Sequence, residues 1–464
     1  MTREFDMVVI GGGMAGLNAV ERAAKLGLRV AVVERDRVGG TCPLRGCIPT
    51  KALVRSAEVA HEARRAAEFG IHVGEVRVDF RAVMERVRGI IDRGATATQA
   101  WLDGVEGAEL FRGEGRMEGP GRVVVGEHTL TAPRIVIATG AVPAIPPIEG
   151  LDRTPHLTSD DVLRLDALPE RLLVIGAGPI ALELGQALGR LGASVTLVDL
   201  LPSLLPHDEP ELVGELQQRL EGEGIAFRFG VTVQRTEPAE GGVRMHIRGP
   251  GGDEVLEGDA LLVATGRVPA VQPLHLEAAG IRDARRGVPV DDHLMARDTQ
   301  GVWAAGDVLG PPFGAFTPVA RHLGVEVVEY ALGTREVPVD TGVGCRAIFT
   351  DPELASVGLT EAAARAAGLR VRVGTGRFRG GKARAWGEEH GQVRIVAEEG
   401  TGRILGAHIL AYHASDLVHP VAVAMTTGTG AETAMRATSH VHPTLGEVVQ
   451  AAVEDATGGR WPNG

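Results

Sequence analysis

The reactive chemistry of this sequence is concentrated in one short segment that holds two of its three cysteines. Cys42 and Cys47 lie five positions apart in GGTCPLRGCIPTK, residues 39–51 of the 464-residue chain. Such a pair could clip a metal ion, form a structural disulfide or form a disulfide that reacts. A zinc site needs about four ligands, commonly in two short-spaced pairs. Because Cys345 stands alone and no second Cys or Cys/His pair has that spacing, we expect no metal site.

Charge and hydropathy help to decide whether the cysteine pair forms a structural disulfide or a reactive one. The formal net charge of −12 argues against nucleic acid or an anionic membrane as a partner. No apolar run approaches the ~20 residues of a spanning helix. The start, MTREFDMVVIGGG, is too charged for a signal peptide. We therefore expect a cytoplasmic protein, and structural disulfides are rare in that compartment, so the pattern favours a redox disulfide.

The cysteine pair follows a segment that is typical of a dinucleotide-binding unit. A short apolar run, FDMVVI, precedes Gly11-x-Gly13-x-x-Gly16, and a helical pattern and the strand LRVAVVE follow. Glycines at this spacing let a pyrophosphate approach the backbone at a helix N-terminus, and Glu34 ends the second strand where it can bond a ribose. A plain glycine turn is the alternative, but the strand, the helix and the acid are all in place.

The same pattern recurs later in the chain as RLLVIGAGPIALELGQALGRLGASVTLVD. Its glycines are Gly176 and Gly178, Ala181 holds the third position, and Asp199 ends the second strand. An acid there accepts a bond from a ribose 2′-hydroxyl and repels a 2′-phosphate, which favours NAD over NADP. Two copies of one unit indicate two nucleotide-binding domains.

These patterns predict an α/β protein with two Rossmann-like dinucleotide-binding domains and a C-terminal α+β domain. RIVIATG, residues 134–140, closes the first unit, and LLVATG, residues 261–266, closes the second. The proline-rich stretch 141–150 is typical of a linker. The segments from about residue 342 onward suggest antiparallel strands. We divide the chain at 1–147, 148–268, 269–341 and 342–464, in which 269–341 completes the first nucleotide site.

Two dinucleotides imply electron transfer between them, and a flavin with a nicotinamide is the natural pair. The cysteine segment directly follows the first unit, so it can lie against the cofactor of that unit. A dithiol beside a flavin can exchange electrons with an external disulfide. The alternative is that both cysteines are simply packed as small hydrophobic residues.

The chain resembles the class I flavoprotein disulfide reductases, also called pyridine nucleotide-disulfide oxidoreductases, over nearly its whole length. The residues that carry the resemblance are GGTC, four residues, then GCIPTK. The resemblance implies bound FAD and NAD, with Cys47 next to the flavin and Cys42 exchanging with substrate. It also implies that Lys51 faces the flavin and pairs with Glu183. CPLRGC departs from the family pattern at Pro43 and Leu44.

The resemblance also implies further cofactor contacts. Asp307, in AAGD, resembles the aspartate that binds the ribityl chain, Thr317 resembles a contact near the flavin ring, and Gly115 resembles a contact at the adenine end. The other implied contacts are Thr41, Thr139, Gly140, Gly266 and Arg267. Taken singly, each of these has an ordinary turn residue as its less favoured alternative.

The segment SHVHPTLGE, residues 439–447, resembles the acid–base motif of the family. By that resemblance His442 takes a proton from the substrate thiol and Glu447 orients the imidazole. In this family the histidine serves the disulfide of the other subunit. A homodimer is therefore implied, with residues 342–464 as its interface.

Within the family, GCIPTKAL and HPTL are most similar to the dihydrolipoyl dehydrogenases. The chain lacks the C-terminal cysteine pair of mercuric reductases, and its HPTLGE differs from the HPTSSEE of glutathione reductases. The expected substrate is thus a dihydrolipoyl-carrying protein or a small dithiol, oxidised with NAD⁺. Three alternatives remain open: a reductase of another disulfide, a reductase of a metal ion such as Hg(II), and a non-catalytic flavoprotein redox sensor.

Overall fold

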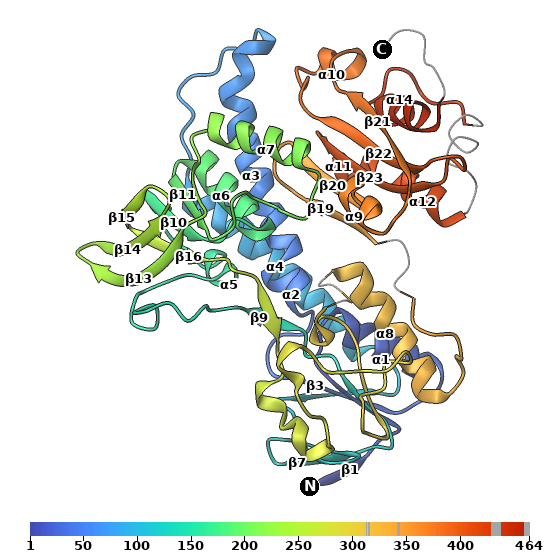
Figure 1. Cartoon of the computed structure of the whole chain (residues 1–464). Coiled ribbons are helices and arrows are strands. Elements are labelled where there is room, and N and C mark those ends of the chain that lie inside the picture. Colours follow the sequence, from blue (N-terminus) through green and yellow to red (C-terminus); the bar gives the residue numbers. More distant parts are fainter. Residues whose placement is uncertain (312, 314–315, 341–343, 428–437, 459–464) are drawn as a thin grey trace.

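The computed structural model of the chain describes residues 1–311, 313, 316–340, 344–427 and 438–458. In this part of the chain the strands form six sheets. Two of them are parallel and belong to the two units that the sequence repeat predicts. Figure 1 shows the first of these units at the N-terminal end of the molecule and the C-terminal antiparallel sheet at the opposite end.

The first unit is built on a five-stranded parallel sheet. Its strands, in order across the sheet, are β18 (Val302–Ala304), β8 (Ile135–Ile137), β2 (Met7–Ile10), β3 (Val30–Glu34) and β4 (Ala108–Arg112). Strands β2, β3 and β8 are apolar at nearly every position because both faces of the sheet are covered. Strand β18 comes from far along the chain, so residues near 300 complete this sheet.

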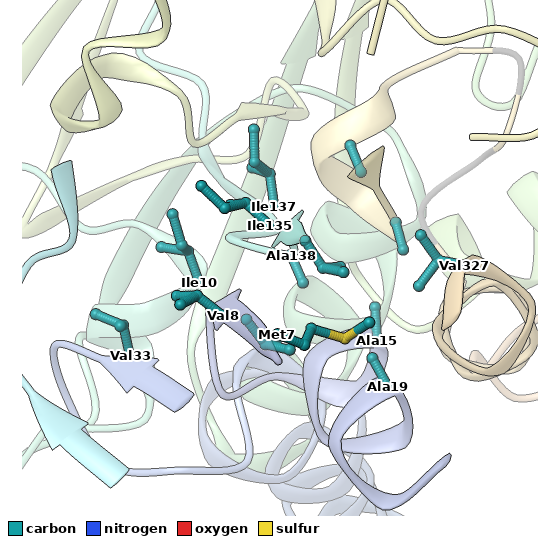
Figure 2. Close-up of a cluster of buried hydrophobic side chains, with 14 of the residues drawn as sticks. Met7, Val8, Ile10, Ala15, Ala19, Val33, Ile135, Ile137, Ala138 and Val327 are labelled. Carbon is teal, nitrogen blue, oxygen red and sulfur yellow. The ribbon is translucent and has the colours of Figure 1, made fainter. Parts of the chain in front are cut away.

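Two helices, α1 (Met14–Lys25) and α8 (Thr317–Leu332), cross one face of this sheet side by side. A Cβ on Gly324 of α8 would lie 2.2 Å from the carbonyl oxygen of Ala15, so only glycine permits this approach. Figure 2 shows Met7 reaching from the sheet toward Ala15 and Ala19 of α1, with Val327 of α8 beside them. This dry contact holds the start of α1 in place.

The cysteine segment lies between the first strands and a long helical hairpin. The helices are α2 (Thr41–Arg45), α3 (Cys47–Arg65), the 3-10 turn η1 (Ala66–Phe69) and α4 (Phe80–Asp103). Cys47 is thus the first residue of α3, a helix of 19 residues.

A side sheet of the first unit has the order β1 (Thr2–Glu4), β7 (His128–Thr131), β6 (Arg122–Val125) and β5 (Arg116–Gly119).

The second unit repeats the first. Its parallel sheet has the order β12 (Ala226–Phe229), β11 (Ser194–Asp199), β10 (Arg171–Ile175) and β16 (Ala260–Val263). Its helices are α5 (Ser159–Val162), α6 (Pro179–Leu191) and α7 (Pro210–Gly222). An antiparallel sheet of β13 (Thr232–Ala239), β14 (Gly242–Gly249) and β15 (Gly252–Gly258) lies beside it.

The two units are joined by a two-stranded ribbon. Strand β9 (Ala141–Pro143) pairs antiparallel with β17 (Arg267–Pro269). We expected a linker over residues 141–150, and the first three of these residues form a strand instead. Each partner places its proline at one end of the paired residues, a position where a missing N–H is tolerated. After β17 come the short turns η2 (Gln272–Leu274), η3 (Leu276–Ala279), η4 (Ala284–Arg286) and η5 (Asp307–Leu309).

The C-terminal unit is an antiparallel sheet covered by helices, as the sequence predicts. Its strands, in order, are β19 (Cys345–Ile348), β20 (Glu353–Gly358), β23 (Ile404–Ala411), β22 (Gln392–Glu398) and β21 (Val371–Arg377). Its helices are α9 (Glu361–Ala366), α10 (Gly381–Ala385), α11 (Ala414–Leu417), α12 (His419–Thr427) and α14 (Gly446–Thr457). A Cβ on Gly374 of β21 would lie 2.1 Å from the Ala452 carbonyl oxygen, so glycine lets α14 sit directly on the sheet.

The predicted fold class is confirmed: two parallel dinucleotide-binding units are followed by an α+β unit. The division at residues 147, 268 and 341 stays a prediction. Among the described residues, no helix is long and apolar enough to cross a membrane.

Candidate active site and cofactor sites

The glycine loop of the first unit is shaped by contacts that exclude side chains. Gly11 has φ +112°, and a Cβ there would lie 2.3 Å from the Ala138 carbonyl oxygen. A Cβ on Gly16 would lie 1.9 Å from the Gly11 carbonyl oxygen, so helix α1 starts in contact with the loop. Gly13 caps this helix without any side-chain bond, which leaves the first N–H groups of the helix available to an anion.

The second unit has the same loop geometry. Gly176 has φ +110°, and a Cβ there would lie 2.5 Å from the Ala264 carbonyl oxygen. Gly178 caps α6 without a side-chain bond, and no atom lies within 4 Å of the position of its missing Cβ. Ala181, in place of the third glycine, is fully buried in α6. This loop therefore also offers bare backbone at a helix N-terminus.

The acids at the strand ends make matching contacts in the two units. Glu34 accepts hydrogen bonds from the backbone N–H of Gly12 at 2.7 Å and of Asp36 at 2.8 Å. Asp199 accepts bonds from Ala177 N at 2.7 Å and Leu201 N at 2.8 Å. Each carboxylate is thus held beside its glycine loop, at the position where a ribose hydroxyl bonds in this fold.

The cysteine segment is attached directly to the first glycine loop. Gly39 donates its N–H to the Gly12 carbonyl oxygen at 2.8 Å. Gly40 has φ +69°, and a Cβ there would lie 2.6 Å from the Cα of Gly13. Two glycine backbones therefore touch, and any larger residue would push the two loops apart. The cysteines are positioned by the same loop that would hold a pyrophosphate.

Cys42 and Cys47 are free thiols in this structure, and they differ strongly in acidity. A hydrogen bond from Cys42 lowers the pKa of Cys47 to about 6, against the opposing effect of burial. The Thr317 hydroxyl, 3.5 Å from the Cys47 sulfur, and the Lys51 ammonium act in the same direction. The same hydrogen bond and burial raise the pKa of Cys42. The reduced pair is therefore a Cys47 thiolate beside a Cys42 thiol.

An ion pair connects the cysteine helix to the other two units. Lys51 of α3 donates to Glu183 of α6 at 2.7 Å, the pairing that the sequence resemblance implied. The second oxygen of Glu183 accepts the backbone N–H of Phe349 at 2.9 Å. The Lys51 ammonium also lies 4.3 Å from the centre of the Phe349 ring. Phe349 was not predicted, because nothing in its segment, AIFTDPE, distinguishes it from an ordinary strand residue.

The predicted contacts at the domain ribbon gather around Arg267. Its guanidinium donates to the Ala141 carbonyl oxygen at 2.6 Å and to the Thr41 hydroxyl at 3.4 Å, next to Cys42. Thr139 donates its hydroxyl to the Ala270 carbonyl oxygen at 2.9 Å, and Gly140 O accepts from Ala270 N at 2.9 Å. Gly266 precedes Arg267 with φ +108° and has no atom within 4 Å of its missing Cβ.

Asp307 and Gly115 lie at the edges of the first unit. Asp307 begins η5, with two residues between it and the end of strand β18, and burial raises the pKa of its carboxyl group while Arg267 opposes that effect. Gly115 is buried where a Cβ would lie 3.0 Å from both Ile10 and Val33, at the ends of β2 and β3. Both positions border the first glycine loop and its sheet.

His442 and Glu447 form a pair at the start of α14. His442 Nδ1 lies 2.9 Å from a Glu447 oxygen, and the other oxygen accepts the Thr444 backbone N–H at 2.8 Å. That backbone bond and His442 lower the pKa of Glu447. The His442 side chain is 77% exposed. Among the described residues of one chain, His442 bonds Glu447 and Cys47 bonds Thr317, and His442 bonds neither cysteine; the peptide bond before Pro443 is cis.

These residues fit the two cofactors that the sequence suggests. Bare helix N-termini at Gly13 and Gly178 suit two pyrophosphates, and the Glu34 and Asp199 carboxylates suit two riboses. The buried Nε of Arg267 has no hydrogen-bond partner among the described atoms, so a donor is available where the first unit meets the ribbon. In the described residues, no group of three or more His, Cys, Asp or Glu could hold a metal ion.

Comparison with protein families gives the same architecture. Residues 5–333 match the pyridine nucleotide-disulphide oxidoreductase family, and residues 345–453 match the dimerisation domain of that family. The chain is a pyridine nucleotide-disulphide oxidoreductase. Its fold and its free Cys42 and Cys47 are therefore those of a flavoprotein disulfide oxidoreductase, an enzyme that uses FAD and NAD(P). The dimerisation domain of this oxidoreductase indicates a homodimer.

Several relatives of this oxidoreductase match over most or nearly all of their length. Dihydrolipoyl dehydrogenase from Rhizobium etli is 36% identical and the one from Bacillus subtilis 33%, each with 99% of both chains covered. Leghemoglobin reductase from Glycine max is 34% identical over 97% of this chain and 87% of its own. Among solved structures, the Cu(II) complex of the HOCl-induced flavoprotein disulfide reductase RclA from Escherichia coli has a TM-score of 0.87 and 27% identity, covering 98% of this chain and 99% of its own.

Proposed function

We propose that this oxidoreductase oxidises dihydrolipoyl groups with NAD⁺, using a redox disulfide between Cys42 and Cys47. The observation that carries the proposal is the asymmetric pair itself. Cys47 is stabilised as a thiolate by Cys42, Thr317 and Lys51, and the pair is attached to a glycine loop that fits FAD. A thiolate that is stable near neutral pH is a good leaving group in thiol–disulfide exchange.

Thiol–disulfide exchange at Cys42 and Cys47 takes place in two displacements at sulfur. A substrate thiolate attacks the Cys42 sulfur, the Cys42–Cys47 bond breaks, and Cys47 leaves as a thiolate. The second substrate thiol then attacks the substrate sulfur bound to Cys42, which closes the cyclic disulfide product and releases Cys42. Two electrons have moved from the dithiol to the cysteine pair. The helix N-terminus at Gly13 and the Glu34 carboxylate would hold FAD, which would supply the chemistry that passes these electrons on to NAD⁺.

Each remaining residue has a role in moving or stabilising charge. His442 of the partner subunit removes the substrate proton, and Glu447 of the partner subunit holds that imidazole through its Nδ1. Lys51 keeps a positive charge beside the thiolate, and Glu183 fixes the direction of that ammonium. Asp199 favours NAD⁺, because its carboxylate would repel a 2′-phosphate.

A pocket that includes Gly39 and Pro43 of the cysteine segment supports a substrate arm. It has a volume of about 380 Å³, and its lining combines Met14, Leu17, Pro43 and Trp101 with the polar residues Asn18, Glu21, Thr98 and Arg321. Pro43 directly follows Cys42 in the sequence, so one lining residue of the pocket is the neighbour of the exchanging cysteine. A substrate arm with both hydrocarbon and polar parts suits this mixed lining.

A second candidate is the reduction of another disulfide or an oxidised metal ion by NAD(P)H. Two observations favour it: the redox turn carries Pro43 and Leu44, which depart from the family pattern, and the fold is similar to RclA, solved as a Cu(II) complex. The reaction would use the same cysteine pair in the opposite direction.

The test is the reduction of NAD⁺ by dihydrolipoamide with purified, FAD-loaded protein. We expect turnover that is lost in Cys42→Ser and in Cys47→Ser, whereas Cys345→Ser, a matched control, retains it. NADP⁺ in place of NAD⁺ should be a poor acceptor. No turnover with dihydrolipoamide, together with NADPH-driven reduction of another disulfide or of Cu(II), would refute the lipoyl substrate and support the second candidate.

A further inference from the structure

The segment of residues 200–209 connects the nucleotide acid Asp199 to helix α7 without regular secondary structure. At its start, Leu201 donates its N–H to Asp199 and accepts a bond from Gly230 N at 2.9 Å. The side chains of Leu200 and Leu201 are 67% and 45% exposed. The start of the segment is therefore held by two bonds at Leu201, one of them to the Asp199 carboxylate, and its course beyond Leu201 depends on what holds the rest of the segment.

The middle of the segment is buried and conformationally unusual. Leu204 and Leu205 are both buried in the core of the second unit. Leu205 has φ +46°, in the left-handed region that a leucine rarely adopts. Such a conformation persists only where the surroundings enforce it. The packing of Leu204 and Leu205, together with the contacts on either side of them, therefore holds the chain in this conformation.

The far end of the segment is held by arginines of the C-terminal sheet. Asp208 and Glu209 are 7% and 2% exposed. Arg346 of β19 donates to Asp208 at 2.7 Å, and Arg394 of β22 donates to Glu209 at 3.1 Å. Arg394 also bonds Glu361 at 2.7 Å. We call these five residues the α7 joint.

Within the α7 joint, Arg346 and Arg394 supply the positive charge that balances the buried carboxylates. Arg394 also pairs with Glu211, so four acids face two guanidinium groups. His408, which is fully buried beside them, donates Nε2 to the Leu359 carbonyl oxygen at 3.0 Å, and burial lowers its pKa. It is therefore neutral near pH 7. Removing one arginine leaves a buried carboxylate without its counter-charge, which is far more costly than losing a surface pair.

We propose that Arg346 and Arg394 are positioning residues for the nucleotide site: by holding Asp208 and Glu209, they fix the segment that begins at Asp199. The inference rests on the proposed binding of NAD at Gly176, Gly178 and Asp199. It makes the C-terminal domain part of the nucleotide specificity of the enzyme, although neither arginine touches the site itself.

The test measures binding of NAD⁺ and NADP⁺ to FAD-loaded protein by calorimetry, well below the unfolding temperature. We expect Arg346→Met and Asp208→Asn each to weaken NAD⁺ binding about 5-fold or more, with little change for NADP⁺, and the double variant to match the single ones. Arg394→Met should act in the same way. Arg370→Met is the matched control, because Arg370 lies on the same domain, is 83% exposed and is 3.9 Å from Glu399.

The outcomes separate the two proposals. Variants that unfold at lower temperature yet bind NAD⁺ as the wild type does would overturn the positioning role and leave the proposed function intact. Wild-type protein that does not prefer NAD⁺ to NADP⁺ would overturn the nucleotide assignment itself. If Arg394→Met does not fold, Arg394→Lys keeps the charge but lacks the planar fork whose separate nitrogens bond Glu209 and Glu361, and it should still weaken NAD⁺ binding. Unchanged affinity in that variant would count against the inference.

Discussion

The acidity of Cys47 gives the most direct prediction from the geometry. Its pKa of about 6 depends first on the hydrogen bond from Cys42, and then on Thr317 and Lys51. At pH 7 a group with this pKa is about 90% ionised, whereas a free cysteine, with a pKa of about 8.5, is only ~3% ionised. Removing the Cys42 donor should therefore raise the pKa of Cys47.

Two substitutions at residue 42 isolate that hydrogen bond. Cys42→Ser keeps an O–H donor, and Cys42→Ala removes the donor; neither variant can form the redox disulfide. A hydrogen bond to a charged group contributes about 1.5–3 kcal/mol, and 1.36 kcal/mol corresponds to one pKa unit. Since a thiol is a weak donor, we expect Cys42→Ala to raise the pKa of Cys47 by about 1 unit. Cys42→Ser should stay within about 0.5 unit of the wild type.

The assay is the thiolate absorbance at 240 nm of the reduced protein as a function of pH. Each variant retains only Cys47 and Cys345, and burial raises the pKa of Cys345, so the two thiols titrate in separate ranges. The expected midpoint for Cys47 is near 6 in Cys42→Ser and near 7 in Cys42→Ala. Equal midpoints in the two variants, or a midpoint above 8 in both, would refute the reasoning.

Three further predictions follow from single contacts. Glu183→Gln removes the counter-charge of Lys51, and water screens part of the loss because the Lys51 side chain is 32% exposed. Urea denaturation should show a free energy of unfolding that is lower by about 1 kcal/mol. An unchanged free energy of unfolding would contradict a stabilising pair. The pKa of Glu447 lies below its ordinary value, so its pairing with the imidazole is present above pH ~4.5 and is lost as the pH falls through the lowered pKa. Glu447→Gln should accordingly reduce kcat/KM for dithiol oxidation about 10-fold between pH 6 and 8, and a profile identical to the wild type would exclude the orienting role. In Gly178→Ala the new Cβ has no atom within 4 Å, so the substitution should raise KM for NAD⁺ without lowering Tm. In Gly16→Ala the new Cβ would lie 1.9 Å from a carbonyl oxygen, so this substitution should lower both Tm and FAD retention. The reverse pattern would contradict the loop geometry.

The two nucleotide units were predictable because their signals are local. Each unit places its apolar strand, its glycines and its terminal acid within about 35 residues, the scale on which a βαβ motif is written. The contacts of Glu34 and Asp199 with their own loops follow from that arrangement. The redox character of the cysteine pair was predicted from the residues and from their place after the first unit, and the family match agrees with it. The separate roles of Cys42 and Cys47 and the His442–Glu447 pair came from the family resemblance, and these roles stay predictions.

Long-range contacts could not be predicted from the sequence. The β9–β17 ribbon pairs two short segments with a proline in each, and prolines argue against strands when only the sequence is read. The bond from Gly39 to Gly12 depends on backbone angles that glycine permits, but the presence of a glycine in the sequence does not indicate that those angles occur. Phe349 reaches Lys51 and Glu183 across 298 and 166 positions, and no local pattern records such a contact.

The central claim is that Cys42 and Cys47 exchange electrons with the nicotinamide through the flavin. The most direct test is to add one equivalent of NADH to oxidised, FAD-loaded protein without oxygen, and to count the thiols that appear. The balance is one NADH and one proton per disulfide, giving NAD⁺ and two thiols. We predict two new thiols per subunit in the wild type, both at residues 42 and 47 by peptide mapping, and none in Cys47→Ser. Reduced flavin without new thiols in the wild type would contradict the account.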